Sequence, residues 1–74
     1  MGSRIPRLTA TEIINILKRH NFVLISQHGS HQKWRNPQTD KQVIVPLHKG
    51  KQLPIGTLKS IIDGSGIGEK SFRS

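Results

Sequence analysis

Residues 27–36, QHGSHQKWRN, hold two of the chain's four histidines, its only tryptophan and two basic residues. Histidine can accept or donate a proton near neutral pH, and lysine and arginine attract phosphate. The two histidines, His28 and His31, flank Gly29-Ser30, which is typical of a two-residue hairpin turn. The segment therefore predicts a histidine pair beside cationic side chains, a combination suited to proton transfer on a phosphodiester.

A hairpin with this turn fixes which side chains share a face of the sheet. His28 would lie directly opposite His31. The other predicted pairs are Gln27 with Gln32, Ser26 with Lys33, Ile25 with Trp34 and Leu24 with Arg35. Side chains alternate along each strand, so one face is expected to carry Leu24, Ser26, His28, His31, Lys33 and Arg35. The other face is expected to form the core, with Val23, Ile25, Trp34, Val43 and Val45.

Opposed histidines have Cβ atoms about 4.5–5.5 Å apart, and nearby positive charge disfavours protonation of each ring. One imidazole is therefore expected to be neutral near pH 7 and able to act as a general base. It could remove the proton of an RNA 2′-hydroxyl, whose oxygen would then attack the adjacent phosphorus. Lys33 or Arg35 would offset the charge on the phosphate oxygens.

Other interpretations of these residues remain open. Surface histidines in a basic domain more often contact phosphate or water than catalyse a reaction. A metal site formed by His28, His31 and His48 is a weaker alternative, because the chain has no cysteine and few acidic residues to complete it. Trp34 is expected in the core, and a base-stacking role would require a different strand register.

The charge of the chain indicates a polyanionic or acidic partner. Twelve Lys and Arg against four Asp and Glu give a formal charge of +8, which favours RNA, DNA or an acidic protein. An anionic membrane is less attractive, because the basic residues fall on predicted strands and loops rather than on one face of a long amphipathic helix. We expect no membrane association.

Length and composition restrict the class of protein. Residues 1–74 have room for a single domain with one small core. The N-terminus lacks the apolar stretch of a secretory signal, and no run approaches the roughly 18 apolar residues of a membrane span. Without cysteine there is no disulfide and no thiolate nucleophile. The expected location is the cytoplasm.

The elements that position the histidines can be assigned from local patterns. A helix is predicted over residues 9–20, where Thr9 and Glu12 form a capping box and Ile13, Ile14 and Leu17 form an apolar stripe. Asn21 can adopt the left-handed conformation that ends a helix. Three antiparallel strands are predicted over residues 22–28, 31–36 and 42–45.

A second helix is predicted after Leu53-Pro54, with Leu58, Ile61 and Ile62 at core spacing and Gly64 or Gly66 at its end. The basic loop before it carries Lys49 and Lys51. These lysines could merely keep the loop soluble, or they could bind phosphate near the helix N-terminus, where backbone amides favour anions. Phe72 is expected to pack back on the body of the domain.

These residues together resemble a known family. Gly29-Ser30-His31, the aromatic Trp34, Ile44-Val45-Pro46 and the closing segment Leu53-Pro54-Ile55-Gly56-Thr57-Leu58-Lys59-Ser60-Ile61-Ile62 with Gly66-Ile67 are similar to the HicA family of toxins. The similarity covers nearly the whole chain. The sequence departs from the family pattern at Ile55, an extra residue between Pro54 and Gly56 that can shift the start of the second helix.

The resemblance implies an α+β fold like that of double-stranded-RNA-binding domains, α-β-β-β-α, with both helices on one face of a three-stranded antiparallel sheet. It implies an mRNA-cleaving endoribonuclease that arrests translation when free. We expect this enzyme to require no metal and no small-molecule cofactor. It also implies a partner, a HicB-type antitoxin that covers the active surface. The catalytic histidine of the family corresponds to His31, in Gly-Ser-His.

The predicted RNA-binding residues are His28, Ser30, Lys33, Arg35, Lys49 and Lys51. His28 matches no motif of the family, so its assignment depends on the hairpin geometry alone. An alternative function is a non-catalytic RNA-binding module of the same fold, which reads A-form RNA through its shape and phosphates. A weaker alternative is a DNA-binding accessory protein.

Overall fold

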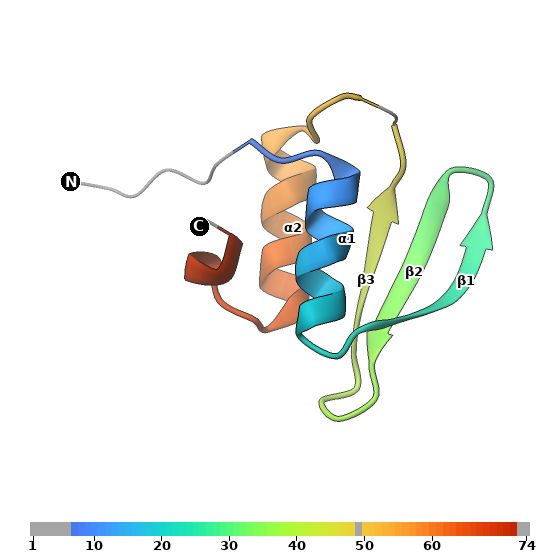
Figure 1. The fold of residues 1–74 in the computed structure, drawn as a ribbon, viewed down its shortest axis with the longest axis vertical. Helices are drawn as coiled ribbons and strands as arrows, with labels where there is room; N and C mark the ends of the chain where they lie inside the picture. The colour runs from blue at the N-terminus through green and yellow to red at the C-terminus, as the bar shows by residue number, and fades with distance from the viewer. Residues whose placement is uncertain (1–6, 49, 73–74) are drawn as a thin grey trace.

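The computed structural model describes residues 7–48 and 50–72. Figure 1 shows two helices packed side by side next to β3, on one side of a three-stranded sheet. Within the described residues, no helix is long and apolar enough to cross a membrane. The elements are α1 (Ala10–Arg19), β1 (Val23–His28), β2 (His31–Asn36), β3 (Lys41–Pro46), α2 (Ile55–Ser65) and the 3₁₀ helix η1 (Glu69–Phe72). This order, α-β-β-β-α, confirms the predicted fold class.

The capping box predicted for α1 is present. The Thr9 hydroxyl accepts a hydrogen bond from the Glu12 amide at 3.2 Å, and the Thr9 amide donates to the Glu12 carboxylate at 2.8 Å. Two amides that lack partners within the helix are thereby satisfied. At the other end Asn21 has a φ of 72°, so the chain turns sharply toward β1, as the sequence predicted.

The sheet is antiparallel with the order β1-β2-β3, so β2 is the central strand. Gly29 and Ser30 form the predicted turn, and Gly29 adopts a φ of +60°, which suits a residue without a side chain. His28 pairs with His31, and Ser26 pairs with Lys33. The predicted register is therefore correct at the end of the hairpin that carries the histidines.

The register changes farther along the hairpin. Leu24 pairs with Trp34 and Val23 pairs with Arg35, because the ladder shifts by one residue at Ile25. The predicted pairs of Ile25 with Trp34 and of Leu24 with Arg35 are wrong. The physical reason is a β-bulge, which places one extra residue in β1 and leaves it without a partner.

The core lies between the helices and the β3 side of the sheet. Trp34, Val43 and Val45 are buried against α1 and α2, as predicted. Val23 and Ile25 were expected in this core but are 49% and 46% exposed. The helices pack near β3, whereas β1 lies at the far edge of the sheet (Figure 1), so the helices do not bury the side chains of β1. Val23 also pairs with Arg35 and therefore faces away from the helices.

The second helix has its N-cap at Pro54 and begins at Ile55, so Ile55 and Gly56 belong to its first turn. The helix ends at Gly66, which has a φ of +69°. Its predicted core positions, Leu58, Ile61 and Ile62, are buried, and so is Phe72 in η1. The chain before α1 also pairs with the chain before α2 through an isolated bridge between Thr9 and Gln52.

Asn36 joins the end of α1 to the turn between β2 and β3. Its side chain is buried, donates to the His20 carbonyl at 3.1 Å and accepts from the Gln38 amide at 2.8 Å. The first bond joins the C-terminal end of α1 to β2, and the second holds the turn that follows β2. Losing this side chain would leave a carbonyl and an amide without their partner.

We expect Asn36→Ala to lower the free energy of unfolding by about 1–3 kcal/mol, the cost of leaving buried polar groups unpaired. Gln38→Ala is the matched control, because it removes an exposed amide side chain while keeping the backbone amide that binds Asn36. Urea unfolding followed by circular dichroism measures both. Equal stability of the two variants would contradict this role of Asn36.

Candidate nucleic-acid interface

The alternation of β2 separates its side chains into two sets. Trp34 and Asn36 are buried on the side of the helices, so His31, Lys33 and Arg35 project from the opposite side. Directly opposed residues share a face. We call this side the outer face. By the register it carries Val23, Ser26 and His28 from β1, His31, Lys33 and Arg35 from β2, and Gln42, Ile44 and Pro46 from β3. Leu24, which the sequence predicted on this face, pairs with Trp34 and therefore lies on the side of the helices.

The two histidines lie side by side where the hairpin turns. Both are exposed, and His31 also pairs with Pro46 on its other side. The Ser30 carbonyl accepts a hydrogen bond from the Leu47 amide at 2.6 Å, which ties the turn to the chain that leaves β3. Within residues 7–48 and 50–72 neither imidazole has a hydrogen-bond partner, so both rings can bond to a ligand.

A chain of side-chain hydrogen bonds supports the hairpin from the opposite face. The Trp34 indole donates to Gln32 at 3.1 Å, Gln32 donates to Gln27 at 3.0 Å, and Gln27 donates to the Gly29 carbonyl at 3.0 Å. The chain links the buried tryptophan to the turn between the histidines. Sequence analysis missed it, although the spacing of Gln32 and Trp34, two residues apart on one strand, places them on the same face.

Lys33 stands in the middle of the outer face, between Ser26 on one side and Ile44 on the other. Its side chain is exposed, and the part of the chain that the structure describes gives it no ion pair. The sequence contains no Asp or Glu from residue 13 to residue 39. The positive charge of Lys33 is therefore available to an anionic ligand.

Arg35 is less available than Lys33. Its guanidinium forms an ion pair with Asp40, to which Nε donates at 2.9 Å and Nη2 also donates. Asp40 lies in the turn after β2 with a φ of 64°, and sequence analysis did not connect the two residues. The pair is partly open to solvent, where such pairs contribute little stability, so a phosphate group can compete with Asp40 for Arg35.

The loop between β3 and α2 carries the remaining predicted residues. Lys49 lies outside the described residues. Lys51 is exposed, and its amide donates to the His48 carbonyl at 3.1 Å. In the described ranges, the structure brings no three His, Cys, Asp or Glu side chains together in a group that could hold a metal ion. The alternative of a metal site at His28, His31 and His48 has no support here.

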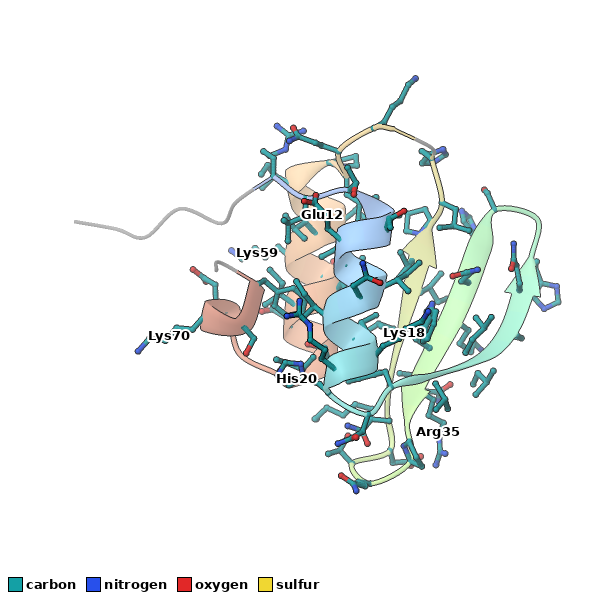
Figure 2. All side chains as sticks on the ribbon, viewed as in Figure 1. Glu12, Lys18, His20, Arg35, Lys59 and Lys70 are labelled. Atoms are coloured by element: carbon teal, nitrogen blue, oxygen red, sulfur yellow. The ribbon has the colours of Figure 1, made fainter. Side chains whose placement is uncertain are left out.

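Other cations lie away from the outer face. Figure 2 shows Lys59 and Lys70 on the side of the molecule formed by α2 and η1, opposite the hairpin of β1 and β2. Lys18, from α1, lies over the Trp34 ring with its Nζ 5.9 Å from the ring centroid. This is a cation–π distance, so Lys18 covers the tryptophan on the helix side of the sheet.

These elements coincide with a known family. A family model described as the HicA toxin of bacterial toxin-antitoxin systems matches residues 10–67. The chain belongs to the HicA toxin family. The match runs from the first residue of α1 past the end of α2 and includes the whole outer face, which confirms the resemblance seen in the sequence. A comparison with curated proteins gives no match.

Membership in the HicA family assigns this chain the role of the toxin in a toxin–antitoxin pair. A partner antitoxin is therefore implied. The outer face of this HicA chain combines two histidines with an unpaired lysine and a partly engaged arginine. Such a surface suits an anionic ligand of the toxin or an acidic partner.

We expect Asp40→Asn to strengthen the binding of a single-stranded RNA oligonucleotide, because it releases Arg35 for one more phosphate contact. The slope of log affinity against log salt concentration should become more negative by about 0.7. Asn tolerates the positive φ of this position. Fluorescence anisotropy across a salt series measures the slope.

Asp63→Asn is the control for this change, since it adds the same unit of charge at an exposed position on α2. Its slope should stay that of the wild type. Equal slope changes in the two variants would mean that net charge alone acts, and that Arg35 makes no added contact.

Proposed function

We propose that this HicA toxin is an endoribonuclease that cleaves mRNA and thereby arrests translation, with His31 as the general acid or base. The observation that carries the proposal is the placement of the exposed histidine pair beside Lys33 on a sheet face without covering helices. His31 belongs to the Gly-Ser-His segment within the matched residues. The phosphate groups of the RNA would be held by Lys33 and Arg35, with His28, Ser30, Lys49 and Lys51 as further binding residues.

The reaction uses a nucleophile that RNA supplies itself. His31 removes the proton from a 2′-hydroxyl, the 2′-oxygen forms a bond to the adjacent phosphorus, and the bond from phosphorus to the 5′-oxygen breaks. The leaving oxygen takes up a proton from a group near the phosphate. Lys33 stabilises the negative charge that grows on the phosphate oxygens. Because the nucleophile is internal and the imidazole transfers the proton, the proposed mechanism is metal-independent.

The openness of the outer face supports RNA, rather than a small molecule, as the proposed substrate. The histidines and Lys33 lie on exposed strand positions, so they can reach a phosphodiester without enclosing it. Binding then depends on phosphate contacts more than on a pocket for one base. This arrangement predicts modest sequence preference and slow cleavage.

We further propose that the partner is a HicB-type antitoxin that inhibits the toxin by occupying the outer face. Acidic side chains laid over Lys33, Arg35 and His31 would exclude RNA through charge complementarity and direct occupancy. Asp40 is the one acidic residue between residues 13 and 62, so the face offers little repulsion to such a partner.

We expect His31→Ala to reduce the rate of RNA cleavage by about 10²- to 10⁴-fold, the contribution of a general acid or base. RNA affinity should change little, because the phosphate-binding cations remain. The measurement is cleavage of a single-stranded RNA in EDTA by free toxin, with affinity recorded on the same oligonucleotide. His48→Ala, which removes an exposed histidine from the loop after β3, should keep the wild-type rate.

Cleavage by neither wild type nor variant, with equal binding, would leave a non-catalytic RNA-binding module. Cleavage that occurs without EDTA and is lost when EDTA is added would indicate a metal-dependent reaction instead.

His28→Ala tests the second proton-transfer group. A rate as low as that of His31→Ala would assign that role to His28, while a smaller loss would limit His28 to binding.

Lys33→Ala should weaken RNA binding and reduce the magnitude of the salt slope by about 0.7, the effect of one lost phosphate contact. Lys59→Ala removes the same charge from an exposed position on the far side of the molecule (Figure 2) and should keep the wild-type slope. A salt series with both variants compares them directly. If the two lysines behave alike, RNA is held by the overall charge and not by the outer face.

A further inference from the structure

Three consecutive apolar side chains of β1 lie open to solvent. Val23 is 49% exposed, Leu24 45% and Ile25 46%. Consecutive residues of a strand point to opposite faces, and here the β-bulge adds an irregularity. Exposed apolar side chains therefore lie on both faces of this strand. We call these three residues, Val23, Leu24 and Ile25, the β1 edge.

The same strand ends the sheet. In the strand order β1-β2-β3, β1 pairs only with β2 among the described residues, and Figure 1 shows it farthest from the two helices. Its outward backbone amides and carbonyls can thus pair with a further strand. An apolar edge of this kind is a liability in a free protein unless a partner covers it.

Charge indicates what kind of chain can add to the β1 edge. Lys33 lies on the outer face opposite Ser26, and Lys18 lies over Trp34, the residue that pairs with Leu24 on the helix side. Cations therefore flank the strand on both faces, and residues 13–39 contain no acid. An approaching strand that carries acidic residues would be attracted, whereas a second copy would bring a chain of charge +8 against another.

RNA does not fit this edge. Aliphatic side chains neither bind phosphate nor provide the aromatic surface on which bases stack. The β1 edge differs in this respect from the histidines and Lys33 a few residues away. The toxin therefore presents two adjacent surfaces of different chemistry, one for a polyanion and one for a polypeptide.

We propose that the β1 edge accepts an extended strand of the antitoxin, which pairs with β1 as a fourth strand of the sheet. Apolar side chains of that strand pack on Leu24 and Ile25, and its acidic side chains face Lys18 and Lys33. This inference rests on the proposed function, because it assigns the anchor of the antitoxin to a place beside the catalytic face. Docking there anchors the antitoxin on apolar side chains next to the outer face, from which its acidic side chains can reach Lys33 and His31.

The test compares two isoleucines with nearly equal exposure. Ile25→Lys changes the β1 edge, and Ile55→Lys makes the same change in charge and volume at a 45% exposed position at the start of α2. The probe is the HicB-type antitoxin encoded with this toxin, purified and titrated by calorimetry. We expect Ile25→Lys to weaken antitoxin binding by about tenfold or more, as for a charge placed in an apolar contact. Ile55→Lys should stay within about twofold of the wild type.

Amide hydrogen exchange of the wild-type toxin with and without antitoxin provides a second measurement that needs no variant. Residues 23–28 should gain protection in the complex. Equal antitoxin affinity of the two lysine variants, or unchanged exchange in β1, overturns the proposal. So does a self-association of the free toxin that only Ile25→Lys abolishes, since a second copy would then occupy the edge.

RNA cleavage and RNA binding by the free variants separate this inference from the proposed function. Both variants should cleave RNA, and neither should bind RNA more weakly than the wild type, because each adds a positive charge. A selective loss of RNA binding in Ile25→Lys would make the β1 edge part of the RNA surface and overturn the proposal. If the free wild type fails to cleave RNA but the variants still differ in antitoxin affinity, the ribonuclease assignment fails while the docking site stands.

Discussion

The burial of Trp34 on the inner side of β2 is the constraint on which the functional surface depends. Because side chains alternate along a strand, fixing one buried position in the central strand determines the direction of every other residue in it. His31, Lys33 and Arg35 are thereby held on the outer face. The tryptophan is in turn held by the core beneath it and by Lys18 above it, and its indole begins the hydrogen-bond chain that reaches the hairpin turn. A single buried side chain thus supports both the core and the hairpin that carries the histidines.

Charge is distributed to match this geometry. The chain carries a net charge of +8. The positive charge of the outer face, however, depends less on the number of cations there than on the small number of acidic residues beside them. Arg35 is the exception, since Asp40 engages it. An ion pair this open to solvent is weak, and it leaves Lys33 as the fully available cation in the centre of the face. Among residues 7–48 and 50–72 the two histidine rings have no competing hydrogen bonds, so in the proposed function they remain available while the cations hold the phosphate backbone at a few points.

The proposed division of labour follows from the position of the helices. Both pack near β3, which leaves the hairpin of β1 and β2 projecting from the body of the domain. In the proposed picture one face of that hairpin transfers protons on RNA, and its outer strand anchors the inhibitor. In this picture the toxin is inhibited tightly by a protein and yet acts on RNA through an open surface. Because the apolar anchor lies apart from the histidines and Lys33, the antitoxin can bind tightly there. The proposed catalytic face then needs no large apolar surface, which would bind other proteins non-specifically.

The sequence by itself determined the features that depend on near neighbours. These are the capping box at Thr9, the turn at Gly29-Ser30 and the opposition of His28 and His31, because each depends on a short run of residues. The family could also be recognised from the sequence, through motifs spread along most of the chain. Only the tertiary structure decided the bulge at Ile25, the exposure of Val23 and Ile25, and the pairing of Arg35 with Asp40. Alternation along β1 predicted a buried face, but burial needs a covering layer, and no local pattern states that the helices lie over β3. The sequence determined which residues are apolar. The packing of the helices on the sheet determined which of these apolar residues are exposed to water.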